Sequence, residues 1–217
     1  MDDIGRDLRS YYEAEARART RTVLSERRVA VVDEFLSLMQ AERRRSVVEF
    51  GAGPGLDGAR FVDAGHRYVG VDLAHGNALL AAERNVTVVQ ADIAALPFAP
   101  GAFDAGWSMS TLMHVPEADV SATVSELVRL LRPGAPLFVG LWGGDQGQIV
   151  SEQGVEGQRR MFSLRSPGRN RELLAASAPI EWSTTWDLGP DHWSYQLFRL
   201  RVGATAEDSS RSVSPRR

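Results

Sequence analysis

The most constraining feature of the chain is a short apolar stretch that runs directly into a glycine-rich loop. Residues 47–58 read Val-Val-Glu-Phe-Gly-Ala-Gly-Pro-Gly-Leu-Asp-Gly. Glycine lets the backbone turn sharply and bring its N–H groups close to a ligand. In an open parallel sheet, ligands bind outside the carboxyl ends of the strands, which is where such a loop lies. The stretch therefore predicts an α/β fold with a binding site at the end of its first strand.

The sequence after this loop alternates between apolar and amphipathic segments. We expect parallel strands at 47–50, 68–71, 86–90, 103–108 and 136–142. Helix-like segments fall between most of them, and this alternation gives a parallel sheet covered on both faces. Two later strand-like segments, near 180–187 and 193–202, predict an antiparallel hairpin that closes the sheet. The pattern indicates a doubly wound, mostly parallel sheet of seven strands.

The two ends of the chain differ from this middle part. Residues 6–44 have apolar residues at three- and four-residue steps and contain neither Gly nor Pro, which is typical of helices. The 217 residues are more consistent with one elaborated domain than with two. We therefore expect an N-terminal helical lid over 1–45, a main body over 46–202 in the same domain, and a Ser- and Arg-rich tail over 203–217 that is disordered.

The composition excludes several classes of function. The chain has no Cys, which removes disulfides, thiolate nucleophiles and Cys-based metal sites, and its 25 basic residues are all Arg, which removes catalytic lysines. We find no His, Asp and Glu spacing typical of a metal site. The net charge of −3 argues against a nucleic-acid partner. Since there is neither a long apolar run nor a signal-peptide pattern, we expect no membrane partner and a cytoplasmic location.

An acidic residue lies at or just after the end of each of the first three predicted strands. Glu49 lies inside the end of the first strand, Asp72 ends the second and Asp92 follows the third. One interpretation uses Gly53, Gly55 and Gly58 as a dinucleotide fingerprint, with Asp72 binding a ribose. The other starts from Glu49, because a carboxylate there can hold an ammonium group but would repel a pyrophosphate. The second interpretation accounts for all three carboxylates, which would bind an amine, a ribose and a base.

With these motifs in order, the sequence resembles the class I S-adenosylmethionine-dependent methyltransferases, particularly the small-molecule subgroup called type 11. The resemblance covers about residues 11–142. Besides 49–55 it rests on Asp72-Leu73, Asp92-Ile93, Leu96-Pro97-Phe98, Phe103-Asp104-Ala105-Gly106-Trp107-Ser108, Leu112-Met113-His114-Val115-Pro116 and Leu131-Arg132-Pro133-Gly134. Ala135 stands where the family usually has a second glycine. The resemblance implies a Rossmann-like fold and S-adenosylmethionine as the cofactor.

The resemblance also implies a set of cofactor-binding residues. The glycine loop would pass under the methionine part, Asp72 would bind the ribose, and Leu73 would lie on the adenine. Asp92 and the Ile93 amide would recognise the adenine edge, while Ser108 and Met109 would face the sulfonium. Tyr12, or its neighbour Tyr11, would contact the cofactor from the lid. The complete expected set is Tyr12, Glu49, Gly51, Ala52, Gly53, Gly55, Asp72, Leu73, Asp92, Ile93, Ser108 and Met109.

Two features bear on the acceptor and on catalysis. Methyl transfer needs a base only when the acceptor must lose a proton, and His114 is the candidate, since some sugar O-methyltransferases resembling this chain use a His at that place. A packing role for His114 stays open. Trp107, Trp142, Trp186 and Trp193 lie near predicted strand ends, where they form either an apolar acceptor pocket or part of the core.

The expected function is transfer of a methyl group from S-adenosylmethionine to a small-molecule acceptor by in-line displacement. One alternative is a methyltransferase-like module that binds the cofactor or a partner without catalysis. A second, less favoured, is an NAD(P)-dependent oxidoreductase, whose short-chain form needs a lysine that this chain lacks. The sequence predicts neither the acceptor nor the oligomeric state.

Overall fold

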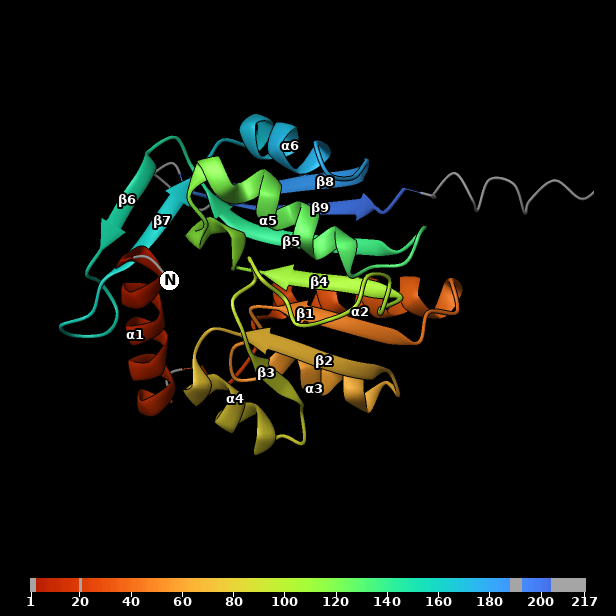
Figure 1. Cartoon of the computed structure of the whole chain (residues 1–217), viewed down its shortest axis with the longest axis horizontal. Helices are drawn as coiled ribbons and strands as arrows, with labels where there is room; N and C mark the ends of the chain where they lie inside the picture. Colours follow the sequence, from red (N-terminus) through yellow and green to blue (C-terminus); the bar gives the residue numbers. More distant parts are fainter. Residues whose placement is uncertain (1–2, 20, 188–192, 204–217) are drawn as a thin grey trace, which may run out of the picture.

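The computed structural model describes residues 3–19, 21–187 and 193–203 (Figure 1). All but the first residue of the predicted 203–217 tail lies outside these ranges. The elements are α1 (Asp3–Ala18), α2 (Glu26–Ala41), β1 (Ser46–Phe50), α3 (Leu56–Asp63), β2 (Arg67–Asp72), α4 (His75–Ala82), β3 (Val88–Gln90), β4 (Ala105–Met109), the 3-10 turn η1 (Leu112–His114), α5 (Glu117–Arg129), β5 (Pro136–Gly143), β6 (Gly147–Ser151), β7 (Arg160–Leu164), α6 (Pro167–Ala175), β8 (Ile180–Asp187) and β9 (Ser194–Arg201).

The main sheet has seven strands in the order β3-β2-β1-β4-β5-β9-β8. Strands β1 to β5 pair parallel with one another, whereas β9 pairs antiparallel with both β5 and β8. Every residue of β1 and β4 is buried, as expected of central strands covered on both faces. The predicted Rossmann-like, mostly parallel seven-stranded sheet with an antiparallel C-terminal hairpin is confirmed.

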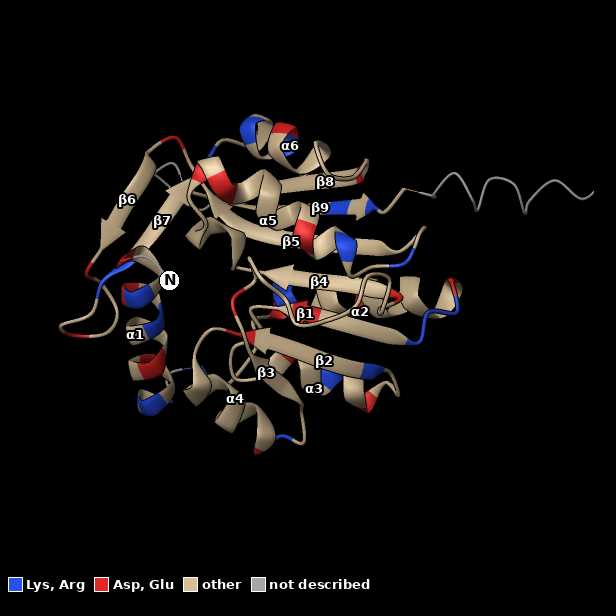
Figure 2. Cartoon of the chain, viewed as in Figure 1, with Lys and Arg blue, Asp and Glu red and all other residues tan. Residues whose placement is uncertain are grey.

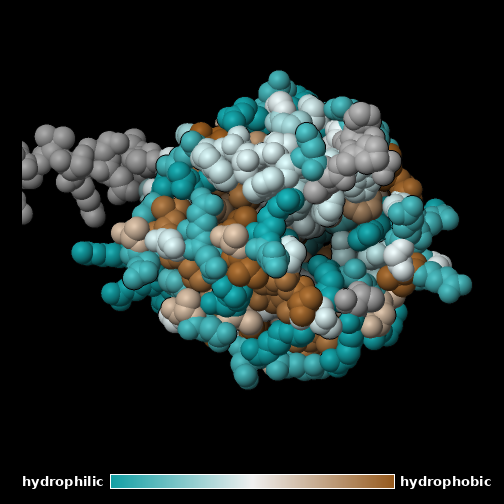
Figure 3. Space-filling view, turned by 180° about the vertical axis from the view of Figure 1, so that it is seen from behind, coloured by the Kyte–Doolittle hydropathy of each residue, from teal (hydrophilic) through white to brown (hydrophobic). Residues whose placement is uncertain are grey.

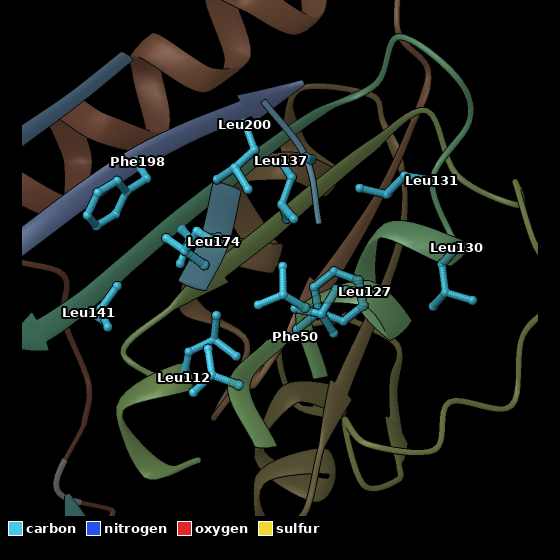
Figure 4. Packing of buried hydrophobic residues seen from close by; sticks show 14 of the residues in the cluster. Phe50, Leu112, Leu127, Leu130, Leu131, Leu137, Leu141, Leu174, Phe198 and Leu200 are labelled. Carbon is cyan, nitrogen blue, oxygen red and sulfur yellow. The ribbon is translucent and has the colours of Figure 1, made fainter. Parts of the chain in front are cut away.

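Helices cover the sheet on both faces, and each face has its own apolar core. On one side the core includes Val32, Phe35 and Met39 of α2, which pack with Phe61 of α3 and Trp107 of β4. The other core lies under α5 and α6 and is drawn in Figure 4, where Leu127 and Leu174 point toward Phe50, Leu137 and Phe198 of the sheet. Figure 3 shows the back of the molecule, where apolar surface lies among hydrophilic side chains.

Two segments differ in detail from the sequence prediction. The helical stretch 6–44 is divided into α1 and α2: Arg19 adopts a left-handed conformation with φ of 51°, and the Ser25 side chain caps α2 by accepting from Arg28 N at 3.2 Å. Strands β6 and β7, which are not among the strands predicted from the sequence, pair in a separate two-stranded sheet. Figure 1 shows this hairpin beside α1, away from the main sheet.

The strand order reverses between β1 and β4, and this position fixes where a ligand can bind. In an open α/β sheet the loops after two such strands turn to opposite faces and leave a crevice between them. The loops after β1, β2 and β4 meet at this edge of the sheet. Charged residues of both signs are spread over the elements drawn in Figure 2. None of the described helices combines the length and apolar character needed to cross a membrane.

Candidate functional site

The glycine loop after β1 is held in a conformation that needs glycine. Gly51, Gly53 and Gly55 have φ values of 77°, 55° and 77°, all in the left-handed region. A Cβ on Gly51 would lie 2.0 Å from Thr111 Oγ1, so the loop also approaches the end of β4 closely. The Gly51 and Ala52 N–H groups both donate to Val71 O, at 2.8 and 2.9 Å. These bonds fasten the loop against the end of β2.

Asp72, the last residue of β2, organises the crevice floor. Its Oδ2 accepts from Gly53 N at 2.7 Å, and its Oδ1 accepts from Ala74 N at 2.9 Å and Asn77 Nδ2 at 3.0 Å. Burial raises the pKa of Asp72, while these bonds act in the opposite direction. A carboxylate oxygen can accept about two hydrogen bonds, so Oδ2 retains capacity for one more donor.

A cavity of about 540 Å³ opens above this floor, a volume within the usual range for small-molecule sites. It extends from the glycine loop past the end of β2 to the end of β3, and the N-terminal part of α1 covers it. Nine of the thirteen residues predicted for the site line it: Tyr12, Gly51, Gly53, Asp72, Leu73, Asp92, Ile93, Met109 and His114. The structure thus brings most of the predicted set together around one cavity.

A smaller cavity of about 190 Å³ continues from the glycine loop toward α2. Two predicted residues, Glu49 and Ala52, line this one, together with Arg21, Arg28 and Asp57. Glu49 is buried and accepts from the Tyr68 hydroxyl at 2.5 Å. Burial, and then the neighbouring Asp57 carboxylate, raise the pKa of Glu49 well above its ordinary value. A cation in this cavity would stabilise the ionised form of Glu49.

Asp57 links this cavity to α2 and β4. Its Oδ2 accepts from Trp107 Nε1 at 2.8 Å and from Arg28 Nη1 at 3.2 Å, while its buried Oδ1 has no hydrogen-bond partner among the described residues. A buried carboxylate oxygen without a donor is costly unless a ligand supplies one. The small cavity therefore combines acceptor capacity at Asp57 and Glu49 with the two guanidinium groups of Arg21 and Arg28.

His114, at the end of η1, is buried with both ring nitrogens engaged. The Met161 carbonyl, 2.7 Å from Nδ1, can only accept, so Nδ1 carries the proton. The other nitrogen, Nε2, then accepts from the Tyr12 hydroxyl at 2.7 Å. Burial lowers the pKa of His114 to about 4. The ring is therefore neutral at pH 7, and the lid residue Tyr12 occupies the lone pair that a base would use.

Helix α1 is fastened over the large cavity at both of its ends. The Glu13 carboxylate accepts from His75 N at 2.6 Å and Gly76 N at 2.9 Å and so caps the first turn of α4. Arg19 pairs with Glu83, the residue directly after α4, and Asp7 pairs with Arg159 near the β6–β7 hairpin. Of the segment 1–45 that is expected to form a lid, α1 lies over the large cavity, whereas α2 packs on a face of the main sheet.

Two predicted residues line none of these cavities. Gly55 caps α3, and a Cβ there would lie 2.9 Å from the Ala81 Cβ, so this glycine serves the packing of α4. Ser108 is fully buried in β4, and its Oγ has no hydrogen-bond partner within the described part of the chain. Trp107 belongs to the apolar core.

Several residues that line the two cavities were not predicted from the sequence. Arg21 lines both cavities, Arg28 the smaller one, and Thr111 the larger one. Arg21, between α1 and α2, and Arg28, in the first turn of α2, lie in an Arg-rich stretch without a motif, so only the fold distinguishes them. Thr111 directly precedes the 112–116 motif, and the position of that motif after β4 is the one signal that pointed to it.

Comparison with known proteins identifies a domain family and several similar proteins. A family model described as a methyltransferase domain matches residues 47–134. A protein of Mycobacterium avium described as an uncharacterized methyltransferase is 33% identical over 144 residues, which cover 63% of this chain and 56% of that protein. The chain thus spans a little over half the length of this relative.

Two solved structures share the fold over nearly the whole chain. The 1,6-didemethyltoxoflavin-N1-methyltransferase of Burkholderia thailandensis has a TM-score of 0.68 and 21% identity, covering 92% of this chain and 88% of that one. The geranyl diphosphate C-methyltransferase of Streptomyces coelicolor has a TM-score of 0.66 and 14% identity, covering 93% and 98%. Residues 47–134 thus match the methyltransferase-domain family, and the chain has the fold of these two methyltransferases.

Proposed function

We propose that the protein transfers a methyl group from S-adenosylmethionine to a small-molecule acceptor. The observation that carries this proposal is the pair of joined cavities along the ends of β1, β2 and β3. Acidic residues lie at three points along them: Glu49 in the smaller cavity, and Asp72 and Asp92 in the larger one. This order suits a ligand that has an ammonium group, a ribose and an adenine in sequence.

The residues present fit such a ligand. Asp72 Oδ2 has room for a ribose hydroxyl, and Leu73 and Ile93 supply apolar surface for the adenine in the same cavity. In the smaller cavity Glu49 and the free Asp57 Oδ1 would accept from the ammonium group, while Arg21 and Arg28 would pair with the carboxylate. Charges of both signs in one small cavity are what a zwitterionic amino-acid group requires.

The cofactor supplies an activated methyl group on its sulfonium, so the protein's main task is to position the acceptor. Holding two reactants in the right geometry contributes on the order of 7–11 kcal/mol to lowering a barrier. His114 is the proposed base for an acceptor that must lose a proton. Because Tyr12 donates to His114 Nε2, the acceptor would have to displace the Tyr12 hydroxyl or pass its proton through it.

A small acceptor is supported by the shape of the site and by the likeness to known structures. Residues of this chain's own α1 and α2 border the cavities, whose volumes of about 540 and 190 Å³ suit a small molecule. The similar structures from B. thailandensis and S. coelicolor act on 1,6-didemethyltoxoflavin and geranyl diphosphate, both small molecules.

Calorimetric titration of the purified protein with S-adenosylhomocysteine tests the cofactor assignment, with NAD and NADP as controls. We expect binding of S-adenosylhomocysteine alone, with an affinity on the order of micromolar. A folded protein that binds NAD or NADP instead, or none of the three, would contradict the proposal. Turnover of S-adenosylmethionine with a broad panel of acceptors then separates an enzyme from a binding module.

A further inference from the structure

A third cavity, of about 580 Å³, lies on the other side of Met109 and Ser110 from the large cavity. These two residues, at the end of β4, line both. Met109 also lines the small cavity, so all three spaces meet at this side chain. A molecule in the third cavity would therefore present one end to the point where the other two join, which is where the proposed cofactor would hold its sulfonium.

The walls of the third cavity are mainly apolar and aromatic. Val31 of α2, Met109 of β4, Trp142 of β5 and Tyr195 of β9 line it. The Trp142 ring meets Tyr195 edge to face, with centroids 5.7 Å apart, and meets Trp193 in the same way at 5.9 Å. These contacts fix the orientation of the Trp142 ring. A rigid indole beside a phenol ring favours a flat aromatic ligand, because ring stacking adds to the free energy of apolar burial.

A glycine in β5 makes room for this arrangement. A Cβ on Gly140 would lie 2.3 Å from Met109 Sδ and 2.6 Å from the Tyr195 hydroxyl. Because Gly140 has only a hydrogen there, the Tyr195 hydroxyl can approach Met109 Sδ to 3.6 Å. The thioether and the phenol thus stand side by side at the inner end of the third cavity.

The charged residues that line the cavity offset one another. Glu26 and Arg27 are neighbours in the first turn of α2 and have opposite charges. Arg28, also in the lining, is paired with Asp57, and Arg27 lies over the Trp186 ring at 5.1 Å from its centroid. Because these groups contribute no net charge, we expect the aromatic walls to determine which ligands bind in the third cavity.

The geometry points to a planar aromatic acceptor that lies against Trp142 in the third cavity, with its nucleophilic atom directed toward Met109. This inference rests on the proposed methyl transfer and names the class of molecule that receives the methyl group. In that reaction a lone pair of the acceptor atom forms the new bond to the methyl carbon. The S–CH₃ electron pair stays on sulfur, and a hydroxyl acceptor releases its proton to a base or to solvent.

Two matched probes test this inference: 2-naphthol and its saturated analogue decahydro-2-naphthol, which differ in aromaticity and flatness. Each is titrated calorimetrically into the protein alone and into the protein saturated with S-adenosylhomocysteine, which blocks the proposed adenine site. We expect 2-naphthol to bind about five- to tenfold more tightly than the saturated alcohol in both cases, as ring stacking of ordinary strength predicts.

Variants of Trp142 test whether 2-naphthol binds in the third cavity. Trp142→Leu should reduce the preference for 2-naphthol to less than about twofold, since only the ring stacking is removed. Trp142→Phe keeps a flat ring and should retain most of the preference. Trp182→Leu is the matched control, because Trp182 lies on β8, is 36% exposed and lines none of the three cavities. Circular dichroism of each variant confirms that it is folded.

The outcomes separate the inference from the function on which it rests. Equal binding of both alcohols, no binding of either, or a preference that survives Trp142→Leu would overturn the aromatic acceptor. If Trp142→Leu does not fold, the inference is tested by the preference of the parent protein for 2-naphthol and by the preferences of Trp142→Phe and Trp182→Leu. Failure of S-adenosylhomocysteine to bind would instead refute the cofactor assignment, and titration of the protein alone would still show whether the third cavity selects aromatic rings.

Discussion

His114 shows how one buried side chain links the stability of the fold to pH. Its folded-state pKa is about 4, below its ordinary value of 6.5, because burial disfavours the charged ring. The unfolded chain therefore binds the proton more readily, so stability should fall as the pH drops from about 6.5 to 4. The full shift corresponds to a loss on the order of 3 kcal/mol by pH 4.

Urea unfolding at pH 7 and pH 4.5, compared between the parent protein and His114→Gln, checks this prediction. The variant lacks the titrating ring, so its stability should decrease less over the same interval. Carboxylates titrate in both proteins and cancel in the comparison. An equal decrease would mean that His114 is not held neutral by burial.

Asp72 is the residue on which the cofactor assignment depends most directly. Asp72→Asn keeps an oxygen acceptor for the glycine loop but loses the charge, so we expect the affinity for S-adenosylhomocysteine to fall by about 1.5–3 kcal/mol per lost charge-assisted hydrogen bond. Calorimetric titration measures this change. Asp63→Asn, an exposed change at the end of α3, is the control and should have no effect. Unchanged affinity in a folded Asp72→Asn protein would refute the ribose role.

At the scale of the elements, the turn after β1 depends on the absence of a side chain at Gly51. Gly51→Ala combines a φ of 77° with a Cβ only 2.0 Å from Thr111 Oγ1. Thr111 cannot move freely, because its hydroxyl donates to Phe50 O at 3.1 Å. We expect a loss of stability of about 1–3 kcal/mol from the strained conformation, with a further contribution from the clash.

Gly65→Ala separates these two effects. Gly65 has a φ of 84°, but no atom of the described residues lies within 4 Å of the Cβ that a substitution would add. Thermal unfolding of both variants should therefore show the larger decrease in melting temperature for Gly51→Ala. Equal decreases would mean that the loop after β1 yields to the extra atom, and that its approach to β4 does not hold the site in shape.

The strands and the glycine loop were predictable from sequence because their signals are local. A buried parallel strand is a continuous apolar run, and the acidic residues fall at fixed positions relative to the strand ends, as at Glu49 and Asp72. The helix-like segment between the fourth and fifth predicted strands forms α5, whose buried Val120, Val124 and Leu127 recur at helical spacing. The division of 6–44 into α1 and α2 was not predicted, since Arg19 carries no glycine-like signal at its left-handed position.

The contacts between distant segments could not be predicted from sequence. Tyr12 and His114 are 102 positions apart, and nothing in either local pattern indicates that the phenol occupies the imidazole lone pair. Arg28 reaches Asp57 only because α2 and α3 cover the same face of the sheet. The strand β6 lies in a polar, Gly-rich segment without a local strand pattern. It forms a strand because it pairs with β7 in the folded protein.

At the scale of the whole molecule, α1 is held more weakly than the sheet it covers. Only Tyr11 and Ala16 of α1 are buried, whereas β1 and β4 are buried throughout. The two ion pairs that join α1 and the residue after it to distant segments, Asp7 with Arg159 and Arg19 with Glu83, are largely exposed, and such pairs contribute about 1 kcal/mol or less. Local opening of α1 should thus cost far less than unfolding of the sheet.

Hydrogen exchange with mass spectrometry tests this difference. Amides of α1 should exchange well before those of β1, β4 and β5, and raising the salt concentration should accelerate α1 alone by screening its ion pairs. If α1 covers the bound cofactor, S-adenosylhomocysteine should then slow exchange in α1, because a ligand that binds the closed form shifts the population toward it. Protection of α1 equal to that of the sheet would show that it does not open separately. If S-adenosylhomocysteine slows exchange in β1 but does not change exchange in α1, the ligand binds without contact to this helix. That result would contradict the role of α1 as a lid.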